Sequence, residues 1–146
     1  MSDKRIVQKV VVAAVIIKDN KILVVQRNKN EAIFPNMWEL PSGRKEFLES
    51  TTSSLVRETK EETGLDVEII VPLFVFDYQV EKDGEVRDST QINFLVKLLD
   101  QNQEVKLSLE HQDFAWVRVE EIDDYNFTAA TKKVISRGFD LISKFL

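Results

Sequence analysis

Residues 7–17 form an almost unbroken run of apolar side chains, most of them β-branched. Such a run is typical of a central strand, because β-branched side chains pack well on the pleated surface of a sheet. The next four residues, Lys-Asp-Asn-Lys at positions 18–21, indicate a turn. Because residues 22–26 are again strand-like, the sequence predicts that the fold begins with a hairpin.

The rest of the chain predicts further strands and two helices. Strand-like segments lie at residues 38–40, 67–78, 90–99, 105–109 and 114–119, with a hairpin turn at residues 82–85. Residues 49–65 predict a helix with Ser50 or Thr51 as its cap, Gly64 as its end, and an inward stripe of Thr52, Leu55, Val56, Thr59 and Thr63. Residues 128–146 predict a second helix whose apolar face carries Val134, Ile135, Phe139, Ile142 and Phe145. A mixed sheet with at least two helices is an α+β or α/β layered domain.

Length and composition restrict the class of protein. The 146 residues suit a single domain spanning 1–146, and no Pro/Gly/Ser-rich linker divides them. The net charge of -5 argues against sequence-independent binding of nucleic acid, although it does not exclude a small polyanionic substrate. The apolar run at residues 10–17 is too short to span a membrane, so we expect a cytoplasmic protein with no membrane partner.

The residue types available also restrict any metal site. The chain has no cysteine and one histidine, His111, so thiolate sites and sites with several histidines from one chain are excluded. Oxygen ligands must therefore dominate, which favours Mg²⁺, Mn²⁺ or Ca²⁺.

Three carboxylates lie close together on the first predicted helix. Glu58, Glu61 and Glu62 have the spacing i, i+3 and i+4, which places them on one helical face. Such carboxylates repel one another unless solvent or a cation relieves the repulsion. The three glutamates alone favour an ordinary solvated face, with Arg57 and Lys60 as surface partners.

The wider spacing changes that interpretation. Gly43 is followed after five residues by Glu49, and after seven more by the sequence RETKEETGL at residues 57–65. This pattern resembles the Nudix box, the signature of the Nudix hydrolases, and here it spans residues 43–65. The preceding residues 38–41, Trp-Glu-Leu-Pro, are similar to the usual lead-in of the family. Three positions depart from the common pattern: Ser42, Leu48 and Thr59.

The resemblance implies a fold, a metal and a set of ligands. The fold is a Nudix-type α/β/α sandwich with a mixed β-sheet, and the metal is Mg²⁺, with Mn²⁺ as a possible substitute. The implied ligands are Glu58, Glu62, Glu61 directly or through water, the backbone carbonyl of Gly43, and Glu110. Arg57 would pair with Glu49 or Glu58 and hold the carboxylates in place, a task for which its planar fork is suited.

The resemblance also implies a reaction at a diphosphate linkage. Bound Mg²⁺ would neutralise phosphate charge, orient the phosphates and lower the pKa of a water, and a carboxylate would accept the proton of that water. The candidate catalytic residues are Arg57, Glu58 and Glu61, with Glu110 as a further candidate base. Glu110 can equally be a surface loop residue.

Two further residues are candidates for substrate binding. Arg27, at the end of the second predicted strand, lies where members that cleave nucleoside triphosphates contact phosphate, and Glu39 resembles a residue near the same site. Each also has an ordinary structural interpretation as a polar surface residue.

The sequence constrains the identity of the substrate less than it constrains the kind of bond that is cleaved. The short chain most resembles the MutT-like group, which hydrolyses nucleoside triphosphates to the monophosphate and pyrophosphate. Thr131 stands where that group has a base-reading asparagine, which argues against a specialty for oxidised guanine. A nucleotide sugar, a dinucleotide or the 5′ end of an RNA are alternatives, as is a non-catalytic nucleotide-sensing module. We expect a small nucleotide as the partner and either a monomer or a homodimer.

Overall fold

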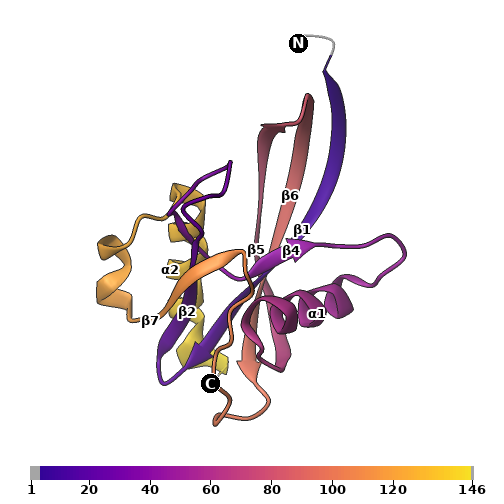
Figure 1. The fold of residues 1–146 in the computed structure, drawn as a ribbon. Helices are drawn as coiled ribbons and strands as arrows, with labels where there is room; N and C mark the ends of the chain where they lie inside the picture. Colours follow the sequence, from indigo (N-terminus) through magenta and orange to yellow (C-terminus); the bar gives the residue numbers. More distant parts are fainter. Residues whose placement is uncertain (1–3, 146) are drawn as a thin grey trace.

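The apolar run near the N-terminus forms the central strand of a seven-stranded sheet (Figure 1). In the computed structural model, which describes residues 4–145, this strand is β1 (Arg5–Lys18) and its hairpin partner is β2 (Lys21–Arg27). Asp19 and Asn20 connect them with φ angles of 51° and 60°. Two successive left-handed residues suit the right-handed twist of a hairpin, and Asp and Asn tolerate that conformation. The predicted hairpin is confirmed.

The sheet is mixed, as predicted. Its order is β3-β2-β1-β6-β5, with β4 paired to β1 and β7 paired to β2. Between the described strands, β1 and β6 run parallel and the other pairs run antiparallel. The remaining strands are β3 (Trp38–Glu39), β4 (Ser42–Arg44), β5 (Val67–Lys82), β6 (Glu85–Leu98) and β7 (His111–Val117).

One helix packs against each face of the sheet. Side chains of β1 alternate between the two faces, so Val15 joins one core and Ile16 the other. Helix α1 (Thr51–Thr63) covers the Ile16 side through Leu55. Helix α2 (Ala129–Phe145) covers the Val15 side. The layers are therefore those of the predicted α/β/α sandwich, and a short 3-10 helix, η1 (Val119–Asp124), precedes α2.

The buried face of α2 agrees with the prediction where the structure describes it. Val134 and Ile135 are fully buried, and Phe139 and Ile142 pack against the same core. The side chain of Phe145, and residue 146, lie outside the described part of the chain.

Helix α1 begins and ends at the predicted residues. The Ser50 side chain accepts a hydrogen bond from the Ser53 N–H, and Gly64, with a φ of 74°, ends the helix. Part of the predicted inward stripe is wrong, because Thr52 and Val56 are exposed. The helix instead buries a charged residue, Glu62, on its inner side.

The strand predicted at residues 105–109 is absent from the described structure. This segment forms neither helix nor strand, since residues 105–108 are irregular and Leu109 lies in a turn. Lys106 donates its N–H to the Thr63 carbonyl at 2.8 Å, and Ser108 donates to the Glu62 carbonyl at 3.2 Å. The last carbonyls of a helix lack partners within the helix, so these bonds satisfy the end of α1. They also carry the chain past α1 towards Glu110.

The strands β1, β5 and β6 extend well beyond the rest of the sheet as a three-stranded arm (Figure 1). The arm is the first half of β1 together with the β5–β6 hairpin, which is longer than predicted and turns at Asp83 and Gly84. Among residues 4–145, no helix is long and apolar enough to cross a membrane.

Candidate active site

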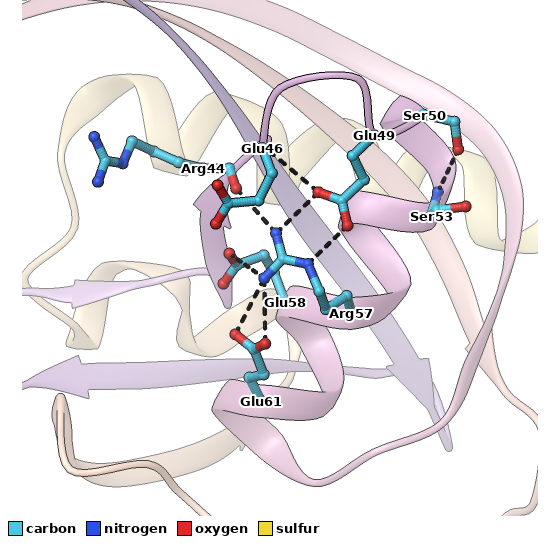
Figure 2. A network of polar contacts seen from close by, with 8 residues as sticks. All are labelled: Arg44, Glu46, Glu49, Ser50, Ser53, Arg57, Glu58 and Glu61. Carbon is cyan, nitrogen blue, oxygen red and sulfur yellow. Dashed lines mark hydrogen bonds and ion pairs between the residues drawn. The ribbon is translucent and has the colours of Figure 1, made fainter.

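Arg57 is the centre of a charged network on the first turns of α1 (Figure 2). Its Nε and Nη2 atoms contact the two oxygens of Glu49 at 2.7 and 3.0 Å. Its Nη1 atom donates to Glu58 at 3.0 Å and to Glu61 at 3.2 Å. The contact with Arg57 lowers the pKa of Glu49 to about 2, and Glu49 and the other carboxylates around Arg57 raise the pKa of Arg57. The guanidinium therefore stays charged and fixes three carboxylates in position.

Gly43 allows the strand β4 to lie directly against Glu58. A Cβ atom built at Gly43 would be 2.0 Å from the Cδ atom of Glu58. Non-bonded carbon atoms normally stay about 3.5–4.0 Å apart, so only glycine leaves this space for the carboxylate. The fixed glycine of the box is thus explained by a close approach of backbone to Glu58.

Glu62 is a buried carboxylate with few partners. Only 5% of the residue is exposed, and one oxygen accepts a hydrogen bond from the Ser42 N–H at 2.7 Å. Burial raises the pKa of Glu62 well above its ordinary value, the Ser42 bond opposes the rise, and the nearby Glu39 and Glu110 add to it. A buried carboxylate among other acids is unfavourable unless a cation or a proton joins it.

Glu110, which directly precedes β7, and His111, the first residue of β7, meet Glu62. One ligand atom of each of the three residues lies within 4.8 Å of the others. Burial also raises the pKa of Glu58. The Arg57 guanidinium opposes this rise, and the charges of Glu61 and Glu110 add to it. The structure therefore brings Glu62, Glu110 and His111 together and places Glu58 near Glu110, while the assignment of Glu58, Glu62 and Glu110 as metal ligands stays a prediction.

Glu61 lies at the edge of this cluster. Its side chain is 58% exposed and is turned towards Arg57. Its position beside Glu58 is compatible with a role through water, and it makes no direct contact with Glu62 among the described interactions.

His111 was not predicted as a site residue. Its side chain is 1% exposed, and its Nε2 atom lies 2.9 Å from Glu39. Its Nδ1 atom has no hydrogen-bond partner among the described residues and lies 3.8 Å from Glu62. The sequence signal was weak, because one histidine at the start of a strand is usually structural. The Ser42 N–H was missed for a different reason, since a backbone donor has no sequence signature.

Arg27 and Glu39, the predicted substrate-binding residues, lie together at the same site. Arg27 Nη1 is 3.6 Å from Glu39, and Arg27 Nε donates to the Ile33 carbonyl at 2.8 Å. Through Glu39 the pair connects to His111 and so to Glu62. Arg27 is about one quarter exposed, so its remaining N–H groups can still reach an anion.

A cleft of about 460 Å³ opens beside these residues and continues along the arm. Its lining includes Glu39, Ser42 and Glu110, which lie around Glu62 and His111, and Phe76 and Tyr78 from β5. Its basic lining residues are Lys9, Arg27, Arg44, Lys82 and Arg87. A cleft with carboxylates at one place and cations around it suits a polyanion that binds together with a divalent cation.

The residues present fit a hard divalent cation. The cluster offers carboxylate oxygens from Glu62 and Glu110 and a nitrogen of His111, with Glu58 near Glu110, and among the described ion pairs no lysine or arginine contacts the buried Glu62. Oxygen-rich donor sets of this kind suit Mg²⁺, Mn²⁺ or Ca²⁺. The unpaired Nδ1 atom of His111 is a further polar group that faces the cluster.

Comparisons with known proteins agree with this site and fold. A family model described as the NUDIX domain matches residues 7–138. The nucleoside triphosphatase NudI of Escherichia coli (strain SE11) is 31% identical over 133 residues, covering 88% of this chain and 94% of that protein. The MutT protein of Methanosarcina mazei Go1 has a similar structure, with a TM-score of 0.76, 25% identity and 99% of both chains covered. A MutT NUDIX hydrolase from Burkholderia pseudomallei has a TM-score of 0.74 at 25% identity, over 90% of this chain and 98% of that one.

These matches span most of the chain and define its class as a Nudix-type α+β fold. The chain belongs to the Nudix family and is a Nudix hydrolase.

Proposed function

We propose that the protein hydrolyses a nucleoside triphosphate to the monophosphate and pyrophosphate, with Mg²⁺ as its cofactor. The observation that carries this proposal is the meeting of Glu62, Glu110 and His111, with Glu58 near Glu110, beside a cleft with a basic lining. The similarity to NudI, which is described as a nucleoside triphosphatase, supports a triphosphate over other nucleotides. A single catalytic domain, a small-molecule partner and a cytoplasmic location stay predictions.

In this proposal Glu58, Glu62 and Glu110 would hold the cation, with the Gly43 carbonyl and Glu61 as further candidate ligands. When bound, Mg²⁺ supplies neutralisation of phosphate charge and activation of water. Manganese has the same preference for oxygen ligands and is expected to substitute.

The residues of the chain then have distinct tasks. Arg57 holds Glu58 and Glu61 through ion pairs, so that neither carboxylate turns away from the cleft. Arg27 binds a phosphate group of the substrate, and Glu39 keeps the guanidinium oriented towards the cleft. Each phosphate contact stabilises the charge that the reaction redistributes.

The reaction itself is a hydrolysis. The oxygen of water bonds to a phosphorus atom of the diphosphate linkage, the bridging P–O bond breaks, and pyrophosphate leaves. A base must take the proton of the water, and Glu58, Glu61 and Glu110 are the candidates. The contacts favour Glu110, because Arg57 restrains the other two through the ion pairs described above.

A substrate panel tests the proposal. Ribonucleoside and deoxyribonucleoside triphosphates, nucleotide sugars, dinucleotides and 5′-triphosphorylated RNA are incubated with the protein, with and without Mg²⁺, and the products are separated. We expect Mg²⁺-dependent release of pyrophosphate from a triphosphate. Turnover of another nucleotide class alone would replace the triphosphate as substrate, and no turnover by folded protein would favour the sensing module.

The variant Glu62→Gln tests the cation site. Glutamine keeps an oxygen for the Ser42 N–H but removes the buried charge, so turnover should fall at least about tenfold. In metal-free buffer near pH 8 the same variant should melt at a higher temperature than the unmodified protein, because the uncompensated charge is gone. Unchanged turnover would contradict the assignment of Glu62. The matched control Glu68→Gln changes an exposed glutamate on β5 and should leave both quantities unchanged.

A further inference from the structure

Residues of the arm line part of the cleft. The positions of these lining residues follow the strand register. Gln91 on β6 lies opposite Phe76 on β5 and Val11 on β1. One step further along the arm, Ser89 lies opposite Tyr78 and Lys9 in the same way, and all six residues line the cleft. The rings of Phe76 and Tyr78 are 5.9 Å apart between centroids and tilted by 41° to each other, so two neighbouring aromatic rings lie beside Gln91.

The side chain of Gln91 is held in one orientation by a chain of hydrogen bonds. Asn93, which is fully buried, donates through Nδ2 to the Phe74 carbonyl at 3.2 Å. Because a carbonyl can only accept, this bond leaves Asn93 Oδ1 as an acceptor, and Gln91 Nε2 donates to it at 2.9 Å. The amide of Gln91 therefore keeps its Oε1 atom and its second N–H group for a ligand in the cleft.

Where the resemblance would place a base-reading asparagine, α2 carries Thr131, which has no amide. Thr131 lines the cleft, but its hydroxyl already accepts a hydrogen bond from Thr128 at 2.9 Å. Thr128 also accepts the Thr131 N–H, so the two threonines serve the first turn of α2. A long, pre-oriented amide is better suited than this hydroxyl to recognise the edge of a heterocycle.

We infer that Gln91 reads the nucleobase of the substrate, in a site where the base lies over Phe76 and Tyr78. This inference rests on the proposed nucleoside triphosphate activity and adds the residue that determines base specificity. The aromatic rings accept any base by stacking. The fixed Oε1 atom accepts a hydrogen bond from an N–H group on the base edge, and the remaining N–H donates to a neighbouring acceptor.

The pre-orientation is what makes this amide discriminating. A glutamine free to rotate presents either its oxygen or its nitrogen and accepts several base edges. Here Asn93 fixes the order of donor and acceptor, so a base with the reverse order leaves Gln91 with unsatisfied polar atoms. A polar group left unpaired in a partly buried site is the usual source of strong discrimination.

The test compares base preference in the unmodified protein and in Gln91→Met, which keeps a similar length but removes the amide. Values of kcat and KM are measured for triphosphates of all the common bases. We expect the unmodified protein to prefer one base at least about tenfold in kcat/KM, and Gln91→Met to reduce the preference to about threefold or less, mainly by raising KM for the preferred base. Gln8→Met, an exposed glutamine on β1 outside the cleft lining, is the matched control and should keep the preference.

The outcomes separate this inference from the proposed activity. Turnover without any base preference, or a preference that survives in Gln91→Met, would overturn the role of Gln91 while leaving triphosphate hydrolysis intact. Absence of turnover would instead contradict the proposed activity.

A second measurement, on the unmodified protein, tests the inference even if Gln91→Met misfolds or if the protein shows no turnover. The side-chain amide signals of Gln91 are followed by NMR during titration with nucleoside monophosphates and, separately, with pyrophosphate. We expect these signals to shift with one monophosphate and to stay in place with pyrophosphate. No shift with any monophosphate would refute the inference.

Discussion

Replacing Gly43 by alanine tests the central geometric relation of the site. The new Cβ atom would be 2.0 Å from both Cδ and Oε2 of Glu58 and 2.6 Å from its Cγ. Carbon atoms in contact lie about 3.5–4.0 Å apart, so the carboxylate must move by about 1.5 Å or more. Catalytic groups tolerate shifts of about 0.5 Å, and a misplacement of about 1 Å can reduce the rate about a hundredfold.

We therefore expect Gly43→Ala to lower kcat/KM at least about a hundredfold, which corresponds to about 2.7 kcal/mol of transition-state stabilisation. The fold should persist, because the clash is with the end of a flexible side chain. Pyrophosphate release measures activity, and thermal unfolding followed by circular dichroism checks the fold.

Ser42→Ala is the matched control for Gly43→Ala. It changes the neighbouring residue of β4 and keeps the N–H that Glu62 accepts, so it should remain close to the unmodified activity. A folded Gly43→Ala protein with more than about a third of the original kcat/KM would refute the reasoning, because the Glu58 carboxylate would then not need its present position.

Three further predictions concern the same segment. Leu48 is fully exposed with a φ of 65°, so Leu48→Gly should raise the free energy of unfolding by up to about 1 kcal/mol in urea titrations; a decrease would show that the left-handed strain is absent. Arg57→Lys cannot make the two-atom contact with Glu49, so it should lower turnover about tenfold or more and raise the Mg²⁺ concentration needed for half-maximal rate; an unchanged Mg²⁺ requirement would contradict the positioning role. The pKa of Glu49 is about 2 in the folded protein against an ordinary 4.5, so the stability that this carboxylate contributes is present above pH 4.5 and is lost as the pH falls towards 2. Urea titrations of the unmodified protein and Glu49→Gln should therefore converge in acid, and a constant difference down to pH 2 would exclude this assignment.

The sequence predicted the fold well where local patterns carry the information. The β-branched run, the Asp-Asn turn and the Ser50 and Gly64 helix ends are local features, and each was found where predicted. Leu48 is also informative, because it stands where the family commonly has a glycine and adopts a left-handed backbone with a φ of 65°. Such a backbone favours glycine, so Leu48 departs from the common pattern at a position where the backbone of this chain still suits glycine.

The prediction failed where a partner comes from a distant segment. The alternation at residues 105–109 indicates an extended backbone, but it cannot tell whether that backbone pairs with a strand or with the end of a helix. Likewise, the spacing of the glutamates could not show that Glu62 is buried against Ser42 while Glu61 faces solvent. His111 enters the site only because β7 pairs with β2 and brings it to Arg27.

Unfavourable electrostatics coincide with the proposed site. Glu62 is buried, faces Glu39 and Glu110, and receives one hydrogen bond from Ser42. A fold selected for stability alone would place an apolar side chain there, since replacing buried charges by apolar groups is often stabilising. The ion pairs of Arg57 are with Glu49, Glu58 and Glu61. This arginine thus aligns the outer carboxylates, while the inner one, Glu62, has no lysine or arginine partner among the described ion pairs. That arrangement is unfavourable for the chain by itself and becomes favourable when a divalent cation binds, which is the physical basis for assigning the cation to this cluster.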